Sequence, residues 1–319
     1  MKRKLIALLL SAVAVIMLMG AGVEQPVMAV EPVASSVRTE EPSAPVEEPV
    51  DKIVPEEQIE QPAQSTMPEL DRILLLDGQP VPKTVGRTTV NGMTYVSLKV
   101  MSQQLDTSAQ VSWDCESNTV CVTTDSLTIT ASEGQLYMIA NGRYLYMPEG
   151  VIVRDGQMMV CLDALAKAFD ATTGWDSEAG TFTVQRGSGA IVSGDEYYRE
   201  DDLFWLSRVI YAESGNQILE GKMAVGNVVL NRVNDKSGIW PDSIHGVVSQ
   251  KNQFSTYRNG RLANRTPNAE SVIAAKLVLD NGVVDEVKDA YFFDAFNQYS
   301  WAARNKDVLA VIGGHRFYG

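Results

Sequence analysis

The chain has 319 residues, enough for two domains, and its 27 Lys and Arg against 40 Asp and Glu give a net charge of −13. This acidity argues against a nucleic-acid partner, because phosphate backbones are bound through Lys and Arg. The two histidines, His245 and His315, are too few for a zinc site built mainly from imidazoles. We therefore expect no metal and no cofactor.

Residues 1–29 have the pattern of a signal peptide. A basic start, Met1-Lys-Arg-Lys4, precedes an apolar run from Leu5 to Met19, and Val27-Met-Ala29 offers small residues for cleavage. The run is short for a membrane span, although an uncleaved anchor is the alternative. We predict a secreted or cell wall-associated protein that meets the membrane only through this segment.

Two linkers are predicted. Residues 30–70 hold seven of the 13 prolines together with many glutamates and no aromatic residue, a composition typical of a disordered, extended segment. Residues 188–200 are rich in Ser and Gly and separate two regions of different texture.

The segment between the linkers, residues 71–187, is predicted to be β-rich. Short apolar or alternating runs indicate strands at Ile73–Leu76, Thr119–Thr124, Leu127–Thr130, Leu136–Ala140 and Thr181–Gln185. Turn pairs typical of tight hairpins separate such runs: Asp77-Gly78, Asn91-Gly92, Asn141-Gly142 and Asp155-Gly156.

An internal repeat is visible within this segment. Tyr95-Val-Ser-Leu98 and Met159-Val-Cys-Leu162 each lead into a helical stretch, which is followed by Trp113-Asp114 and Trp175-Asp176 respectively. The offset of 62 to 64 residues predicts a duplicated strand–helix–hairpin unit, and so an α+β stalk domain. The repeat resembles the copper amine oxidase N-terminal domain, a stalk-like attachment. The resemblance implies no catalytic residues and no copper; inert spacing and wall binding are both open roles.

The three cysteines lie in this segment. Cys115 and Cys121 either pair across a turn in an oxidising exterior or serve, with Cys161, as small apolar residues. None is close in sequence to a histidine, which argues against a Cys-His hydrolase.

Residues 201–319 are predicted to be mainly helical. The acidic run Glu200-Asp-Asp202 suits a helix start, and Gly215 with Asn216 suits its end. One face of this helix is apolar and closes with a carboxylate at helical spacing: Leu203, Leu206, Val209 or Ile210, then Glu213. Desolvation on this face would raise the pKa of Glu213, as a general acid requires; the alternative is a solvated helix end.

A second helix is expected from about Ile218 to Val233. A polar stripe at Glu220, Asn227, Asn231 and Asn234 interrupts its apolar surface. The stripe lines a sugar-binding cleft or faces water. For Asn227 and Asn231, which lie among valines, hydrogen bonds to loop backbone are the favoured interpretation.

Ordered motifs run through this second domain: Tyr211-Ala-Glu-Ser, Glu220-Gly, Ala224-Val, Val228-Val-Leu-Asn-Arg232, Gln253-Phe-Ser255, Ala290-Tyr-Phe-Phe293, Trp301 with Asn305, and Val311-Ile-Gly-Gly-His-Arg-Phe-Tyr318. Over residues 203–318 they resemble the SleB-type cell-wall hydrolases, the spore cortex-lytic group. The resemblance implies a lysozyme-like fold and cleavage of peptidoglycan glycan strands. It places the catalytic acid on Glu213. It departs at Gln217, where the family often has a second Glu.

Six further residues are substrate-binding candidates: Ser214, Asn231, Gln253, Tyr291, Trp301 and His315. Each has a structural alternative, such as a turn cap, a loop amide, a core aromatic or a buried histidine. With one well-placed carboxylate, the resemblance implies a lytic transglycosylase that forms 1,6-anhydromuramyl ends, in wall remodelling or cortex lysis. A hydrolytic muramidase and a non-catalytic wall-binding protein are the alternatives. The histidine and cysteine inventory argues against a zinc amidase or a Cys peptidase. Nothing in the sequence predicts an oligomeric state.

Overall fold

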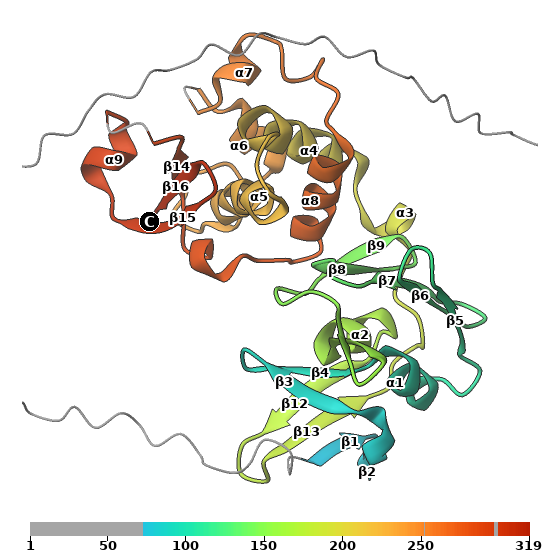
Figure 1. Ribbon diagram of the computed structural model, residues 1–319. Helices are drawn as coiled ribbons and strands as arrows, with labels where there is room; N and C mark the ends of the chain where they lie inside the picture. Colours follow the sequence, from blue (N-terminus) through green and yellow to red (C-terminus); the bar gives the residue numbers. More distant parts are fainter. Residues whose placement is uncertain (1–72, 252, 297–298) are drawn as a thin grey trace, which may run out of the picture. The chain divides into compact units, whose positions relative to one another are not determined.

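A computed structural model describes residues 73–251, 253–296 and 299–319 of the chain (Figure 1). The predicted signal segment and the predicted linker at residues 30–70 lie outside this part. All of the described residues belong to one compact unit. Its described part has a β-rich domain, residues 73–187, followed by a mainly helical domain, residues 200–319, which confirms the predicted order. Within the described ranges, no helix has both the length and the apolar character needed to cross a bilayer.

The ends of the β-rich domain meet in one four-stranded sheet of order β12-β13-β1-β2. Its strands are β1 Ile73–Leu76, β2 Gln79–Pro80, β12 Thr172–Asp176 and β13 Thr181–Gln185. Strand β1 runs parallel to β13, with Leu74 opposite Phe182. This pairing closes the domain by joining its first strand to its last.

A second sheet, of order β10-β11-β4-β3, packs against the two α-helices of the domain. Its strands are β3 Arg87–Val90, β4 Met93–Ser97, β10 Ile152–Arg154 and β11 Gln157–Cys161. The α-helices are α1 Leu98–Leu105 and α2 Leu162–Ala168, and a short 3-10 helix, η2 Lys83–Val85, precedes β3. The central strands β4 and β11 pair antiparallel and lead directly into α1 and α2. They are the two segments that the sequence repeat aligns; the duplication itself stays a prediction.

The third sheet is a five-stranded antiparallel meander in chain order. It comprises β5 Gln110–Asp114, β6 Thr119–Thr123, β7 Thr128–Ser132, β8 Tyr137–Ala140 and β9 Arg143–Tyr146. The predicted strands match β1, β6, β7, β8 and β13 to within two residues at either end.

Tight turns fix the register of the hairpins. At all four predicted turn pairs, both residues have positive φ, as in Asn141 at 48° and Gly142 at 78°. Two successive positive φ values are the geometry of a type I′ turn, which matches the twist of the flanking strands and is easiest for Asn, Asp and Gly. The turn predictions are therefore confirmed.

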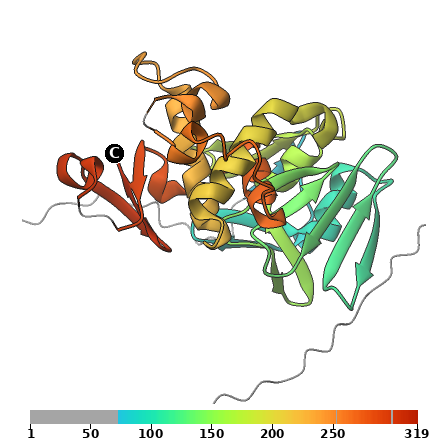
Figure 2. The same cartoon turned by 90° about the horizontal axis from the view of Figure 1, so that it is seen from above.

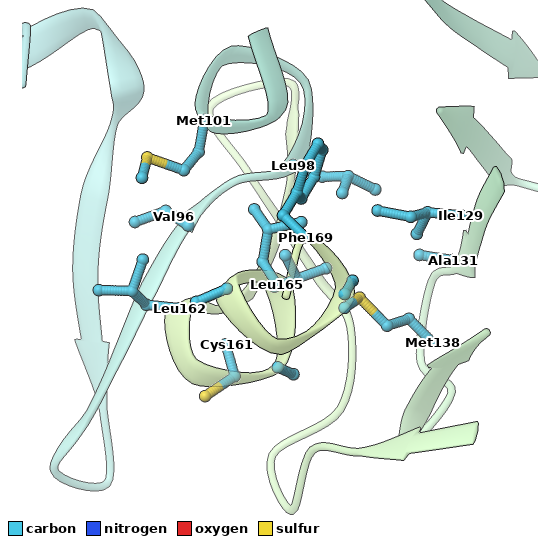
Figure 3. Packing of buried hydrophobic residues seen from close by; sticks show 14 of the residues in the cluster. Val96, Leu98, Met101, Ile129, Ala131, Met138, Cys161, Leu162, Leu165 and Phe169 are labelled. Atoms are coloured by element: carbon cyan, nitrogen blue, oxygen red, sulfur yellow. The ribbon is translucent and has the colours of Figure 1, made fainter. Parts of the chain in front are cut away.

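The core of the β-rich domain lies between its helices and the meander. Figure 3 shows Leu98, Leu165 and Phe169 in the centre of this core, between Met101 on one side and Ile129 of the meander on the other. These side chains are at most 2% exposed, so the apolar area that they remove from water is the main stabilising term.

The cysteines do not pair in the structure. Cys115 is exposed, Cys121 is half-buried and Cys161 is buried, and all three are free thiols. The disulfide between Cys115 and Cys121 that the sequence left open is therefore absent, and only Cys161 fills the core.

The helical domain packs α4, α5 and α8 around a common core, with a small C-terminal sheet and α9 to one side (Figures 1 and 2). Its helices are α4 Glu200–Ser214, α5 Leu219–Asn234, α6 Ile244–Ser249, α7 Ser255–Arg258, α8 Ala269–Leu279, η3 Asp285–Val287 and α9 Trp301–Asn305. The sheet, of order β14-β16-β15, comprises β14 Phe292–Asp294, β15 Val308–Ile312 and β16 His315–Tyr318.

The two long helices begin and end close to the predicted positions. Helix α4 begins at Glu200 and is capped by Gly215, and α5 lies within one residue of its expected ends. Gly226 allows the close approach of the core helices, since a Cβ there would lie 3.0 Å from Ile210 of α4 and 3.1 Å from Val278 of α8.

A buried ion-pair cluster connects the β-rich domain to the helical domain. Asp280, which caps α8, accepts two hydrogen bonds from Arg143 of β9, at 2.9 and 2.7 Å. Lys167 of α2 lies 2.7 Å from the same carboxylate, and Tyr198 donates to it at 3.0 Å. Tyr198 follows the short helix α3 Gly194–Tyr197, so the predicted linker at 188–200 is folded against both domains.

Candidate active site

Glu213 lies in the last turn of α4 and opens into a pocket of about 590 Å³. The pocket is lined by Glu213, Ser249, Gln250, Lys251, Gln253, Phe254, Ser255, Tyr257 and Arg258. Among these described residues Glu213 is the single carboxylate. The same lining contains two cationic residues, Lys251 and Arg258. The carboxylate therefore stands alone in a cleft large enough for a sugar ring.

The surroundings of Glu213 favour its protonated form. Burial raises the pKa of its carboxyl, while a hydrogen bond from Thr256 and the charge of Arg265 lower it; the net shift is upward. The Thr256 hydroxyl donates to Glu213 Oε1 at 3.4 Å. Desolvation without a close ion pair is the environment that keeps a carboxylic acid protonated toward neutral pH.

A second part of the pocket lining is positioned by a buried residue, Phe254. Phe254, 5% exposed, packs into the helical core immediately before α7, the short helix that carries Thr256 and Tyr257. Behind it lies Arg232 of α5, whose guanidinium is 4.3 Å from the ring centroid of Trp240 and 5.7 Å from that of Phe254. Burial lowers the pKa of Arg232 to about 10. The packing of Phe254 thus sets the position of Thr256 relative to Glu213.

Of the six substrate-binding candidates, Gln253 lines the same pocket as Glu213. Ser214 is fully buried, and its hydroxyl donates to the Ile210 carbonyl at 2.8 Å. It therefore neither lines the pocket nor touches the Glu213 carboxyl; the hydroxyl is held inside the helix.

Asn231 has the structural role that its position among valines suggested. Its amide donates to the carbonyls of Val287 at 3.2 Å and Ala290 at 2.8 Å. One turn earlier, Asn227 donates to Gly282 and accepts from Val284. The stripe on α5 holds the segment 282–290: both amides bond to loop backbone as expected, with Asn227 buried and Asn231 half-buried.

Tyr291 and Trp301 lie away from the residues that line the pocket. The Tyr291 backbone donates to Tyr318 at 2.9 Å and accepts from Arg232 at 2.8 Å, which ties β16 to α5. Trp301 is 55% exposed at the start of α9, with its ring centroid 5.3 Å from that of Phe292.

His315 is buried behind Glu213 and does not reach its carboxyl. Burial lowers the pKa of His315, and a hydrogen bond with the Glu213 backbone and the charge of Asp294 oppose that shift. Its ring lies among aromatic residues, 5.8 Å from Phe293 and 6.3 Å from Phe317. Nδ1 is buried without a hydrogen-bond partner among the described residues, and the hydrogen bond to the Glu213 backbone connects the ring to the end of α4.

Gln217, at the position where the resemblance leads one to expect Glu, connects two turns. Its Oε1 accepts a hydrogen bond from the Gly314 N–H at 2.7 Å, and its Nε2 donates to Asn216 at 3.0 Å. The side chain therefore holds the turn between β15 and β16 against the turn between α4 and α5.

Two residues that affect Glu213, Thr256 and Arg265, are not predicted from the sequence. Thr256 lies 43 residues beyond Glu213 and directly follows Gln253-Phe254-Ser255, a motif that was singled out for its glutamine. Nothing in the local pattern marks Arg265, which acts through charge across the fold.

Comparison with known families assigns a class to each domain. Residues 216–318 match the family model described as Cell Wall Hydrolase, and residues 75–184 match that of the Copper amine oxidase N-terminal domain. Over these ranges the helical domain is therefore similar to the cell wall hydrolases, and the β-rich domain is similar to the copper amine oxidase N-terminal domain. Glu213 lies three residues before the matched range.

The curated relatives are more particular. A "Spore cortex-lytic enzyme" of Oceanobacillus iheyensis is 29% identical over 122 residues, covering 38% of this chain and 42% of the relative. One of Bacillus cereus is 30% identical over 125 residues, covering 38% and 45%. The match thus spans less than half the length of these relatives.

Two solved structures cover the same region. The catalytic domain of the Bacillus cereus SleB protein is 26% identical, with a TM-score of 0.34 over 38% of this chain and 92% of that one. The catalytic domain of the germination-specific lytic transglycosylase SleB from Bacillus anthracis gives 26% and 0.34, over 38% and 97%.

Proposed function

We propose that this chain is a secreted enzyme that cleaves the peptidoglycan glycan strand between N-acetylmuramic acid and N-acetylglucosamine, as a lytic transglycosylase. The observation that carries the proposal is Glu213, a half-buried carboxyl with a raised pKa in a pocket that offers no second carboxylate among the described residues. Glycosidases that use water as the nucleophile commonly need two carboxylates, whereas an intramolecular attack needs one.

The chemistry proceeds in two proton transfers through one group. Glu213 in its acid form protonates the glycosidic oxygen as that bond breaks. The resulting carboxylate then removes the proton from the C6 hydroxyl of the muramyl residue, whose oxygen attacks C1. The product is a 1,6-anhydromuramyl end, no water is consumed, and Glu213 returns to its acid form. Thr256 and Arg265 stabilise the carboxylate between the two transfers.

Two structural assignments accompany the function. The packing of α4, α5 and α8 around a common core supports a lysozyme-like fold for residues 201–319. The paired β4–α1 and β11–α2 segments support a duplicated unit in residues 71–187.

The relatives named spore cortex-lytic enzymes support peptidoglycan as the substrate, in the cortex or the vegetative wall. The basic and apolar residues 1–29 support secretion.

Glu213→Gln tests the proposal. The isosteric amide cannot protonate the leaving oxygen, so release of soluble muropeptides from purified sacculi should fall at least about 100-fold while the circular dichroism spectrum is unchanged. Retained cleavage by the folded variant would remove Glu213 from the mechanism.

Mass spectrometry of the wild-type products distinguishes the chemistry. Anhydromuropeptides are expected. Reducing muramic acid ends would mean a hydrolytic muramidase, and an absence of products would mean a non-catalytic wall-binding protein.

A further inference from the structure

The β-rich domain has a pocket of its own, far in sequence from Glu213. Its volume is about 380 Å³, and three segments line it: the junction of β4 and α1, the hairpin of β5 and β6, and the turn between β10 and β11. This size is within the range of small-ligand sites. Nothing in the chemistry of Glu213 uses it.

One wall of the pocket is an indole that the fold leaves in water. Trp113, on β5, is 45% exposed although it is among the largest apolar side chains. Val111, Val120 and Met158 also line the pocket. A flat aromatic face beside an apolar surface fits the C–H face of a sugar ring, since indoles provide large contact area with little conformational freedom to lose.

The same pocket carries polar groups without partners. Gln157 lines it with an amide whose Oε1 is buried and accepts no hydrogen bond from the described residues. Lys99, exposed on the first turn of α1, forms no ion pair within the described ranges. Because Gln157 Oε1 has no accessible surface, the exposed ammonium of Lys99 is the group here that a ligand's carboxylate can reach.

We propose that this pocket binds one N-acetylated amino sugar of a peptidoglycan glycan strand, as a second glycan site; the choice of strand rests on the proposed function. The sugar ring stacks on Trp113 and covers the apolar side chains of Val111, Val120 and Met158. Lys99 pairs with the lactyl or stem-peptide carboxylate of a muramyl residue. Because both sites are in one chain, binding here raises the effective concentration of glycan near Glu213.

The first experiment observes the indole itself. The Glu213→Gln chain is labelled with 5-fluorotryptophan, and the ¹⁹F resonance of Trp113 is assigned as the one of five that Trp113→Phe removes. Peptide-free glycan oligomers of the wall are then added. The Trp113 resonance should shift saturably. Trp175, 46% exposed on the related hairpin and not among the residues lining this pocket, is the matched control and should not shift. No shift at Trp113, or equal shifts at both, would overturn the proposal.

The second experiment measures retention on purified sacculi, again with Glu213→Gln. Trp113→Ala should weaken retention about tenfold, and Trp175→Ala should not. Lys99→Met should weaken binding of strands that contain muramic acid but not of N-acetylglucosamine oligomers. If wild type cleaves sacculi fully but Trp113→Ala does not change retention and the Trp113 resonance does not shift, this site is rejected and the proposed function stands. If the Trp113 resonance shifts but wild type does not cleave sacculi, the site stands and the proposed function is rejected.

Discussion

At the residue scale, the reactivity of Glu213 depends on a balance between burial and one hydrogen bond. Burial favours the acid form that protonates the leaving oxygen, whereas Thr256 favours the carboxylate that takes the proton back. A single group that works in both directions needs a pKa near the working pH, so neither influence can dominate.

Thr256→Val should move the basic limb of the pH–rate profile to higher pH. Removal of the hydroxyl takes away an influence that lowers the pKa of Glu213, so the acid form persists further into the alkaline range. The measurement is the initial cleavage rate of sacculi against pH. Thr256→Ser, which keeps the hydroxyl, is the control and should retain the wild-type limb. An unchanged limb in the valine variant would show that this hydrogen bond does not tune the acid.

At the scale of elements, two connections hold the pocket side of the domain together. Asn227 and Asn231 of α5 fix the segment 282–290 by side-chain bonds to backbone. Gln217 fixes the turn before α5 to Gly314, at the turn between β15 and β16. Asn227 and Asn231 thus connect α5 to the segment that contains η3, and Gln217 connects the turn before α5 to the turn between β15 and β16.

Gln217→Leu should lower the free energy of unfolding by about 1–2 kcal/mol, because it leaves the Gly314 N–H without its acceptor. Gln217→Glu keeps an acceptor in the same place and should stay within about 0.5 kcal/mol of wild type. Urea denaturation of the two variants measures the difference. Equal losses in both would mean that the hydrogen bond to Gly314 is not what Gln217 contributes.

At the scale of the whole described molecule, the buried Asp280 cluster joins the two domains. Burial by itself would raise the pKa of Asp280, but hydrogen bonds and charge from Arg143 and Lys167 outweigh it and hold the pKa below the usual value. Both cations come from the β-rich domain, and they also compensate a negative charge at the C-terminal end of α8, where the helix dipole disfavours it. Ion pairs to Asp280 therefore connect the β-rich domain to the helical domain, in addition to the peptide chain.

Asp280→Asn should destabilise the chain by about 3–5 kcal/mol, because two cations lose a buried anion. The folded-state pKa of Asp280 is below its unfolded value. The stabilisation is thus complete above the unfolded pKa and disappears as the pH falls through the folded one, so the variant and wild type should converge in acid. Denaturant unfolding at several pH values tests this. Asp285→Asn, which breaks an exposed pair with Lys288, is the control and should change stability by less than about 1 kcal/mol.

Local rules were sufficient for much of the fold. Positive φ favours Asn, Asp and Gly, so turns such as Asn141-Gly142 could be predicted from two letters. Helical periodicity placed Glu213 on the face of α4 that carries Leu206 and Ile210, and Gly215 marked the end of that helix. The ordered motifs around it predicted the hydrolase class that the family comparison then gave. These features depend on residues that are close in sequence, so they can be predicted without the tertiary structure.

Tertiary structure decided which residues meet. Thr256 reaches Glu213 across 43 positions, and Arg143 reaches Asp280 across 137. Ser214, adjacent to Glu213 in sequence, instead points into its own helix, because successive residues on a helix face different directions. The sequence by itself determined α4, α5, the tight hairpin turns and the position of the carboxylate. Only the tertiary structure shows which residues set the proton affinity of Glu213 and which ion pair connects the two domains. Both depend on segments that are distant in sequence, since burial and charge act through space.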